Sequence, residues 1–310
     1  MKLLVASHID PGALAALERR HDVLTAFGAP EDELRRLVVD REIVIFRSGV
    51  AISQSVIEHA PALRLLIRAG SGLDNLDLGY ARRRGIVLER VAGPGARSVA
   101  ELTFGLMLVL ARRILVADGL LRQGRWAKSE MVGHLLEGKT VGIVGLGNIG
   151  THVARLATAW GMSAIGCVAR PSESRAAAFA EAGFKLADRE TVLAEGDFVT
   201  IHVPLAEDTR NLIDADAIAR MKRGAFLINV SRGGVVDEGA LYHDLTAGDH
   251  LAGAALDVHL NEGEGKVSPL HALSNVVLTP HIGASTVESQ RQIGEEIVRI
   301  VERMNGESAT

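Results

Sequence analysis

Short apolar runs alternate with helical patterns along most of the 310 residues, and this alternation predicts an α/β protein with parallel sheets. A Gly-Pro-Gly turn at residues 93–95 separates two such series. Only the second series contains a glycine-rich turn with the spacing G-x-G-x-x-G. Together these observations predict two doubly wound parallel-sheet domains, of which the second carries the glycine-rich turn.

The first series occupies the N-terminal third of the chain. We expect its strands at residues 3–6, 43–46, 65–67 and 86–88, and its helices at 12–19, 53–58 and 80–84. A last helical pattern, from 285 to about 305, carries valines and isoleucines on or near one side. We expect this helix to return and close against the first domain.

The second series begins with a long helical run. Ser98 and Glu101 have the spacing of a capping box, and we expect a helix from Ser98 to about Leu121. Further strands are expected at 141–144, 162–168, 198–203, 225–229, 251–258 and 276–278, with helices from 151 and at 176–182, 217–221 and 239–245. We therefore predict a substrate or lid domain at 1–98 with 286–310, and a dinucleotide-binding domain at 99–285.

Three glycines follow the strand expected at 141–144, and each has its own purpose. Gly145 permits the tight turn, Gly147 lets a pyrophosphate approach the backbone, and Gly150 lets the next helix pack closely. The pyrophosphate then accepts hydrogen bonds from N–H groups at the positive end of that helix. This predicts a Rossmann-type cofactor site with contacts from Gly145, Leu146, Gly147, Asn148, Ile149 and Gly150.

The strand at 162–168 ends without the acidic residue that binds the ribose 2′-hydroxyl of NAD in many such sites. Arg170, Ser172 and Arg175 follow it instead. A guanidinium group pairs with phosphate in a planar, bidentate way. We therefore predict NADP as the preferred cofactor, with NAD as the alternative if these arginines are only solvated charges.

Composition excludes several other classes of protein. A net charge of −4 gives no electrostatic case for binding nucleic acid or an anionic membrane. The single cysteine, Cys167, rules out an intramolecular disulfide and a cysteine-based metal cluster, and we expect it to be buried. The apolar runs at 3–6 and 102–111 are too short for a signal peptide or a membrane span. We expect a cytoplasmic protein without a metal site.

Polar residues follow several of the expected strands, where the carboxyl ends of a parallel sheet form a site. Arg232, after the strand at 225–229, can hold a carboxylate with two N–H donors. His281, after the strand at 276–278, can exchange a proton near neutral pH. Glu262 or Glu264 can fix its tautomer. Taken singly, each of these residues is weak support for a site, because most such residues are surface charges or turn residues.

Ordered motifs over nearly the whole chain resemble the D-isomer-specific 2-hydroxyacid dehydrogenase family. They occupy residues 68–75, 98–101, 138–150, 202–205 with Thr209, 221–225, 229–238, 255–258 and 279–283. The resemblance implies a Rossmann cofactor domain, a flavodoxin-like substrate domain and an NAD(P)-dependent oxidoreductase. The missing acid and the Arg170 arrangement are similar to those of glyoxylate and hydroxypyruvate reductases within the family.

The resemblance also implies roles for individual residues. Arg232 is expected to bind the substrate carboxylate, and His281 to donate or accept the proton. Glu262, 19 residues before His281, is expected to pair with it in preference to Glu264. Asp257 is expected to hold the nicotinamide amide. The remaining implied contacts are, for the substrate, Arg47, Gly70, Ser71, Gly72 and Leu73 and, for the cofactor, His202, Val203, Pro204, Thr209 and Gly283.

Two further departures from the family pattern concern loops. Glu262 is followed by Gly263 where proline is usual, and Arg90-Val91-Ala92-Gly93 replaces a usual Asn-x-Pro-Gly. These departures leave the main prediction in place. We expect an NADP-preferring reductase of a small 2-keto acid, hydroxypyruvate or glyoxylate. The resemblance also implies a homodimer built around the long helix after Ser98.

Two alternatives remain. A D-3-phosphoglycerate dehydrogenase is possible if Arg47, Arg90 or Arg97 meets a phosphate. A dinucleotide-sensing scaffold, like the transcriptional corepressors that resemble this family, belongs to another class. Detectable partner binding without catalysis would indicate such a scaffold.

Overall fold

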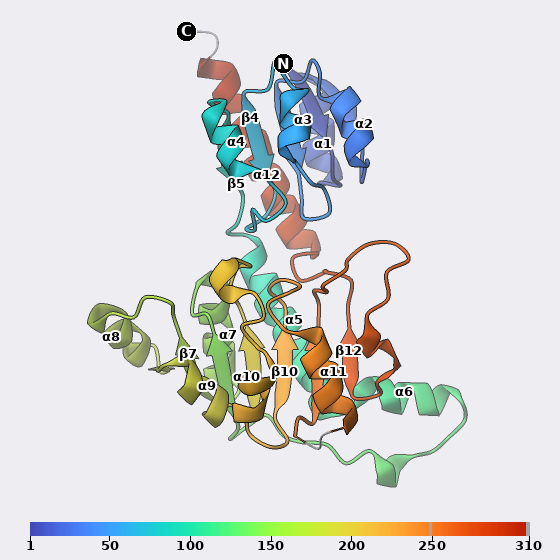
Figure 1. Ribbon diagram of the computed structural model, residues 1–310, viewed down its shortest axis with the longest axis vertical. Helices are drawn as coiled ribbons and strands as arrows, with labels where there is room; N and C mark the ends of the chain where they lie inside the picture. The colour runs from blue at the N-terminus through green and yellow to red at the C-terminus, as the bar shows by residue number, and fades with distance from the viewer. Residues whose placement is uncertain (248–249, 308–310) are drawn as a thin grey trace. The chain divides into compact units, whose positions relative to one another are not determined.

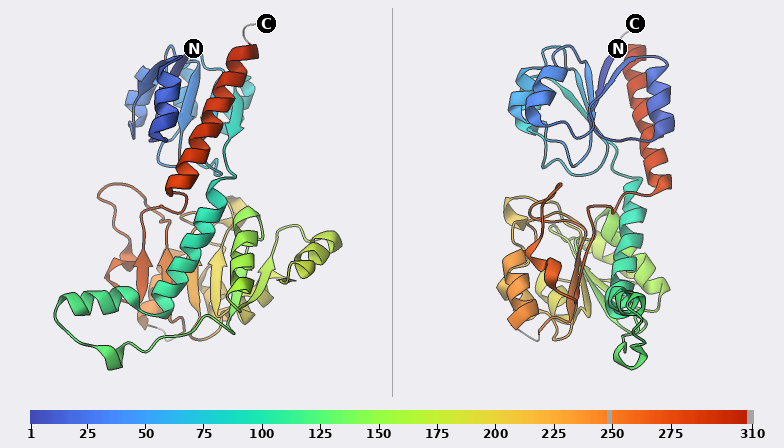
Figure 2. Two further views of the ribbon diagram at one scale, coloured as in Figure 1. Left: turned by 180° about the vertical axis from the view of Figure 1, so that it is seen from behind. Right: turned by 90° about the vertical axis from the view of Figure 1, so that its right-hand side faces the viewer.

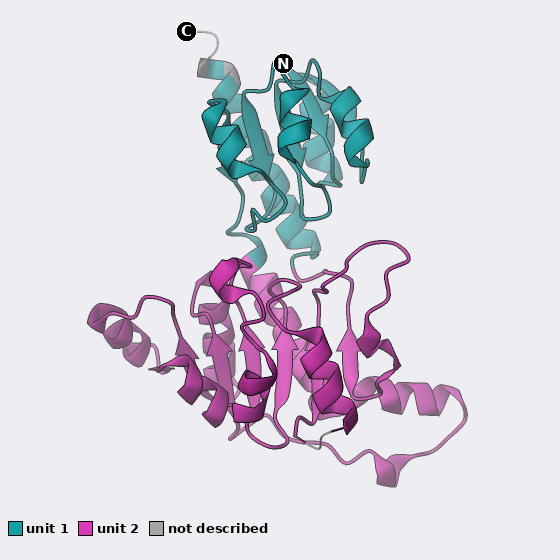
Figure 3. Ribbon diagram, in the orientation of Figure 1, with its two compact units in different colours: residues 1–95, 284–310 teal, residues 96–283 magenta. Residues whose placement is uncertain are grey.

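The computed structural model describes residues 1–247 and 250–307. The chain divides into two compact units, residues 1–95 with 284–310 and residues 96–283 (Figure 3). The breaks fall at 95–96 and 283–284, where the sequence places them at 98–99 and 285–286. Both units are parallel-sheet α/β structures, which confirms the predicted fold class.

The first unit is built on a five-stranded parallel sheet with the order β2-β1-β3-β4-β5, the flavodoxin-like arrangement (Figure 1). Its strands are β1 (Lys2–Val5), β2 (Asp22–Thr25), β3 (Ile43–Phe46), β4 (Leu65–Arg68) and β5 (Val87–Arg90). Its helices are α1 (Pro11–Glu18), α2 (Glu31–Leu37), α3 (Gln54–Glu58), α4 (Leu78–Arg83) and α12 (Val287–Glu307).

Alternating side chains of these strands enter two separate cores. Leu4, Val44 and Leu66 pack in one core with residues of α2, α3 and α4. Leu3 and Ile43 pack on the opposite face with Leu17 of α1 and with α12, which lies beside α1 (Figure 2). The isoleucines of α12 are buried in this second core. The last helix therefore returns to the first unit, as its apolar side predicts.

The second unit is built on a seven-stranded parallel sheet with the order β12-β11-β10-β9-β6-β7-β8. The strands are β6 (Thr140–Val144), β7 (Ser163–Cys167), β8 (Lys185–Leu186), β9 (Phe198–Ile201), β10 (Phe226–Asn229), β11 (Gly253–Leu256) and β12 (Val276–Leu278). From β8 to β11 the order is that of a Rossmann fold, 3-2-1-4-5-6.

Helices cover both faces of this sheet (Figures 1 and 2). One face carries α5 (Gly95–Ala111) and α7 (Asn148–Ala159), and the other carries α9 (Arg189–Glu195), α10 (Ala215–Arg220) and α11 (Glu238–Ala247). The unit also contains α6 (Ile114–Arg122), α8 (Glu173–Glu181) and the 3-10 turns η1 (Lys128–Glu130), η2 (Glu207–Thr209) and η3 (Pro269–Ala272). Cys167 is buried at the end of β7, as predicted.

The prediction of one helix from Ser98 to about Leu121 is wrong at both ends. The helix begins at Gly95, so Ser98 lies buried inside its first turns and no capping box forms at that residue. It ends at Ala111 because Arg113 adopts the left-handed conformation, with φ of 52°, and α6 starts after it. Among the described residues, no helix has the length and apolar character needed to cross a membrane.

Candidate active site

The turn after β6 has the geometry that a dinucleotide requires. Gly145 has φ of 105°, and a Cβ atom there would lie 2.6 Å from the carbonyl oxygen of His202. A Cβ at Gly150 would overlap the carbonyl oxygen of Gly145, so glycine alone lets α7 pack this closely. At Gly147, by contrast, a Cβ would meet nothing within 4 Å. The backbone at Gly147 is therefore open to a ligand.

The first turn of α7 completes an anion site at the same place. Its N-cap residue is Gly147, and no side chain caps the helix. The first N–H groups of a helix lack intrahelical partners and carry the positive end of its dipole. Together with the open backbone at Gly147, they fit the pyrophosphate of a nicotinamide dinucleotide.

His202 follows β9 and lies against the glycine-rich turn after β6, residues 145–150, which we call the fingerprint turn. Its backbone N–H donates to the Val144 carbonyl over 2.8 Å, and its Nε2 lies 2.9 Å from Oγ1 of Thr200. Its Nδ1 is buried and has no hydrogen-bond partner among the described residues. Burial lowers the pKa of His202 to about 3, so its ring is neutral at physiological pH.

Residues next to His202 continue the lining of the turn. A Cβ at Gly145 would contact the Val203 side chain at 3.0 Å. Thr209 closes the following loop, because its Oγ1 donates to the Pro204 carbonyl over 2.7 Å and accepts from the Ala206 N–H over 2.7 Å. His202 and Val203, two of the residues expected to contact the cofactor, thus lie beside the fingerprint turn.

The end of β7 also adjoins the fingerprint, because the backbone N–H groups of Gly145 and Leu146 both donate to the Cys167 carbonyl. The exposed residues Arg170 and Arg175 follow, joined by a 3.3 Å bond from Nη1 of Arg175 to the Arg170 carbonyl. Ser172 caps α8 by accepting from the Arg175 N–H. Glu173, the first residue of α8, also follows β7, so an acid stands close to these arginines in the chain. The side chain of Leu146 is buried, and its backbone N–H is taken up by the Cys167 carbonyl, so the cofactor contact expected of Leu146 stays a prediction.

Arg232 stands in a rigid turn after β10. The side chain of Asn229, which is buried, accepts from both N–H and Oγ of Ser231 and donates from Nδ2 to the Arg232 carbonyl over 3.0 Å. A Cβ at Gly233 would overlap the carbonyl oxygen of His259. The turn that carries Arg232 is therefore packed directly on the segment after β11.

The turn that carries His281 is held by Asp257, a buried residue that follows β11. One carboxylate oxygen accepts from Oγ1 of Thr279 over 2.6 Å and from the Ile282 N–H over 2.9 Å, while the other accepts from the Gly283 N–H over 2.8 Å. The Asp257 carbonyl accepts from the His281 N–H over 2.8 Å. These bonds support His281 in a left-handed conformation, with φ of 54°.

Glu262 contacts His281 directly. Its Oε2 lies 2.9 Å from Nδ1 of His281, and its Oε1 accepts from the His259 N–H over 3.2 Å. Burial raises the pKa of Glu262, but its bonds and opposite charges, those of His281 foremost, outweigh burial and hold that pKa below the usual value. Glu262 is therefore a carboxylate at neutral pH. With Glu262 ionised, Nδ1–H of His281 is the donor in this contact, and Nε2 takes no part in it.

The substrate contacts expected outside this unit lie in the first unit. The loop at residues 70–73 follows β4, and buried Arg68 shapes it by donating from Nε to the Gly72 carbonyl over 2.8 Å. Arg90 donates to the Ser71 carbonyl over 3.4 Å. Arg47 donates to Oε1 of Gln290 over 2.8 Å, and burial lowers the pKa of Arg47.

Sequence patterns assign no role to Asn229, His259 or Arg68. Each of them hydrogen-bonds to a backbone carbonyl of a loop in the site, and such contacts are not visible in a sequence pattern. Of the residues named from the sequence, the structure brings Glu262, His281 and Asp257 into one network, with the Arg232 turn packed against it. Glu264 has no hydrogen bond or ion pair to His281 among the described contacts.

Comparison with known proteins identifies the family. Residues 104–283 match the family described as D-isomer specific 2-hydroxyacid dehydrogenase, NAD binding domain. Over 295 residues the chain is 39% identical to a hydroxypyruvate reductase of Thermotoga maritima, and the match covers 94% of each protein. It is 39% identical over 311 residues to a D-3-phosphoglycerate dehydrogenase of Methanocaldococcus jannaschii, covering 100% of this chain but only 58% of that protein.

A solved structure agrees with the sequence matches. The TT0316 protein from Thermus thermophilus superposes with a TM-score of 0.87 at 34% identity, covering 96% of this chain and 94% of that one. The matched family uses a nicotinamide dinucleotide and a small 2-hydroxy acid, and the fingerprint turn fits such a cofactor. The chain therefore belongs to the D-isomer specific 2-hydroxyacid dehydrogenase family and is an oxidoreductase.

Proposed function

We propose that the protein is an NADP-preferring reductase of a small 2-keto acid, hydroxypyruvate or glyoxylate. The observation that carries the proposal is the 2.9 Å contact of ionised Glu262 with His281, in the same unit as the fingerprint turn and Arg232. The reductase of Thermotoga maritima, which matches over nearly its whole length, supports hydroxypyruvate as the substrate.

The side chains divide the work of the reduction. When bound, the nicotinamide supplies a hydride to the keto carbon. Arg232 holds the substrate carboxylate with paired N–H donors and orients the adjacent carbonyl. His281, as imidazolium, gives its Nε2 proton to the oxygen on which negative charge develops. Glu262 stabilises that imidazolium and keeps Nδ1 protonated.

We assign the second unit as the cofactor domain and the first as the substrate or lid domain. The contacts expected of Arg47 and of residues 70–73 in the first unit stay predictions, as do the cofactor contacts of Asp257 and Thr209. A cytoplasmic location also stays a prediction from the sequence.

The preference for NADP rests on the end of β7. Arg170 and Arg175 are exposed there, and both can offer guanidinium N–H donors to a phosphate. The Ser172 hydroxyl beside them accepts from the Arg175 N–H and lies 3.1 Å from Oγ of Ser174. The test is the initial rate of hydroxypyruvate reduction with NADPH and with NADH. We expect a much higher kcat/KM with NADPH, whereas a preference for NADH would remove the 2′-phosphate site and keep the reaction class.

A D-3-phosphoglycerate dehydrogenase is the second candidate, because the Methanocaldococcus jannaschii relative matches the whole of this chain. Arg90 lies against the loop at 70–73, where it could meet a phosphate. Comparing rates with phosphorylated and unphosphorylated hydroxypyruvate separates the two candidates. We expect the unphosphorylated acid to react faster.

We further propose a homodimer, from the segment between α5 and β6. Helix α6 has five large or branched apolar residues but buries none of its residues. The segment exposes Ile114, Leu115, Leu121, Trp126, Val132 and Leu135. Burying such a surface against a second copy is favourable. Light scattering should give twice the 33.0 kDa of one chain, and Leu135→Asp should weaken the dimer.

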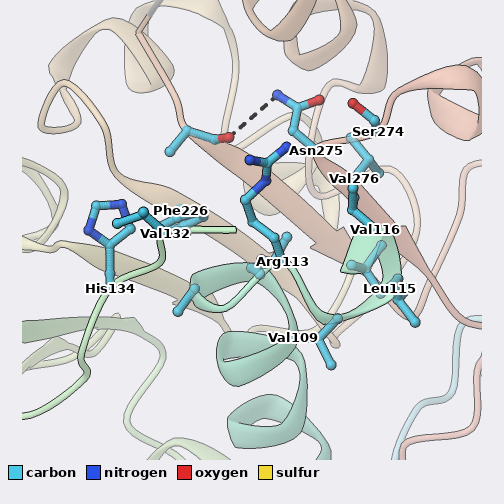
Figure 4. Close-up of a pocket in the computed structure, with 14 residues that line it drawn as sticks. Val109, Arg113, Leu115, Val116, Val132, His134, Phe226, Ser274, Asn275 and Val276 are labelled. Carbon is cyan, nitrogen blue, oxygen red and sulfur yellow. Dashed lines mark hydrogen bonds between the residues drawn. The ribbon is translucent and has the colours of Figure 1, made fainter. Parts of the chain in front are cut away.

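A cavity of about 160 Å³ lies beside this segment and is distinct from the candidate site (Figure 4). Its lining includes Arg113, Val132 and His134, together with Phe226 and Val276 at the amino ends of β10 and β12. Arg232 and His281 follow the opposite, carboxyl ends of the same strands. The cavity therefore lies beside the exposed segment, at the end of the sheet opposite the candidate active site.

A further inference from the structure

Glu238 is a buried carboxylate to which the reaction assigns no part. It is the first residue of α11, and only 7% of it is exposed. Its Oε1 accepts from the Leu260 N–H over 2.6 Å, and its Oε2 accepts from Oγ of Ser268 over 3.2 Å. A buried carboxylate is costly unless such bonds satisfy it, so these two contacts define its place.

The two partners of Glu238 stand at the ends of one segment. Residues 260–267 are all exposed, and Gly263 and Gly265 adopt positive φ values of 122° and 73°. Within the segment, the described backbone bonds join only Lys266 to Gly263. Hydrophobic packing therefore does little to hold this segment, which carries Glu262.

The anchor at Leu260 is next to the groups that orient Glu262. His259, one residue earlier, donates its N–H to Oε1 of Glu262 over 3.2 Å, and its Nε2 lies 2.9 Å from the Thr279 carbonyl in the His281 turn. A shift at Leu260 would move this N–H and the Glu262 side chain together. The Ser268 anchor holds the other end, where Leu270 enters the core.

We propose that Glu238 is a positioning residue, which fixes both ends of segment 260–268 and thereby holds the Glu262 carboxylate against His281. The inference rests on the proposed role of the Glu262–His281 pair. It differs from a purely structural role for Glu238 at the start of α11, because its effect on the reaction passes through Glu262.

A double-mutant cycle tests this dependence. Glu238→Ala should lower kcat by about tenfold and leave KM for NADPH unchanged, since residues in one hydrogen-bond network couple strongly. In a Glu262→Gln background the same change should lower kcat by less than about twofold. An equal fall in both backgrounds would overturn the proposal, because Glu238 would then act independently of Glu262.

Conservative variants guard against simple misfolding. Glu238→Gln keeps an oxygen for the Leu260 N–H and can donate to Oγ of Ser268, so it should retain most of kcat. Ser268→Ala removes one of the two contacts and should give an intermediate loss. Glu264→Gln is the matched control in the same segment and should leave kcat unchanged. If Glu238→Gln is as impaired as Glu238→Ala while both fold, the positioning role is wrong.

A measurement without turnover separates this proposal from the proposed function. The pKa of Glu262 can be measured by NMR from the chemical shift of its carboxyl carbon as the pH changes. His281 and His259 are the residues whose charges lower this pKa. Glu238→Ala should raise the pKa of Glu262, because the carboxylate leaves His281. An unchanged pKa of Glu262 would overturn the positioning role. Unchanged kcat in Glu262→Gln would instead overturn the proposed function.

Discussion

Replacing Glu262 by glutamine removes one negative charge and keeps the shape of the side chain. The amide can still accept from Nδ1 of His281, whose distance to the Glu262 oxygen is 2.9 Å. What is lost is the attraction to the imidazolium that gives up its proton in the reaction. Because this attraction is absent once the proton has been transferred, the variant reports on the supply of the proton.

The size of the loss follows from the exposure of the pair. A hydrogen bond to a charged group contributes about 1.5–3 kcal/mol when well shielded. The side chains of His281 and Glu262 are 26% and 38% exposed, so solvent screening reduces this value. We take about 1–1.5 kcal/mol, which corresponds to a fall in kcat of roughly five- to tenfold.

The assay is steady-state reduction of hydroxypyruvate, followed by loss of NADPH. KM for NADPH should stay constant, because the fingerprint turn makes none of its described contacts with Glu262. His281→Ala should cost much more, about 10²–10⁴-fold in kcat, because it removes the proton donor itself. Unchanged kcat in Glu262→Gln, with a folded protein and an unaffected Glu264→Gln control, would refute the reasoning.

The remaining predictions concern the cofactor, the His281 turn and acid stability. Arg170→Ala with Arg175→Ala should raise KM for NADPH about tenfold or more and leave KM for NADH nearly unchanged, by steady-state kinetics, since charge-assisted phosphate bonds are lost. Gly150→Ala should abolish fluorescence-detected NADPH binding, because its Cβ overlaps the Gly145 carbonyl. Asp257→Ala leaves three donors without their acceptor, and urea unfolding should show a loss of about 3 kcal/mol or more. The contacts of Glu262 lower its pKa in the folded state, so their stabilisation is present above its ordinary pKa of 4.5 and is lost as the pH falls through the lowered value. The difference in unfolding free energy between the wild type and Glu262→Gln should therefore shrink in acid; a constant difference would contradict this reading.

The sheets were predictable because their central strands are buried on both faces. β3 is a continuous apolar run of four residues, and β10 has three apolar residues before Asn229, with turn signals on either side of each strand. This is the pattern of a buried parallel strand. The glycine spacing after β6 then located the cofactor turn. These features depend on residues close in the sequence, so local patterns are sufficient to predict them.

The elements that were missed carry weak local signals. β2 and α2 lie at one side of the first sheet, and α2 is mostly charged, with Leu34 as its one buried residue. β8 has only two residues. The break between α5 and α6 falls at Arg113, which takes a left-handed conformation without the glycine that usually marks one. No periodicity distinguishes these cases from continuous helix or loop.

In the site, the reactive residues could be predicted from the sequence, whereas the residues that position them could not. Arg232, Glu262 and His281 could be named because each follows a strand or matches a motif. The supports depend on distances that a pattern does not contain: Glu238 bonds residues 22 and 30 positions away, and Asp257 bonds Ile282 25 positions away. Such pairings follow from the order of β10, β11 and β12 in the sheet.

The buried carboxylates of Asp257 and Glu238 each support one partner of the Glu262–His281 contact. Asp257 accepts hydrogen bonds from the turn that carries His281, and Glu238 accepts them from the segment that carries Glu262. Neither segment is held by a hydrophobic core at its reactive residue, since His281 and Glu262 are both partly exposed. A proton donor must nevertheless keep its partner within hydrogen-bond reach through each turnover. Because Asp257 anchors one segment and Glu238 the other, the two reactive side chains are held together by groups outside their contact. This arrangement leaves Nε2 of His281 available to the substrate.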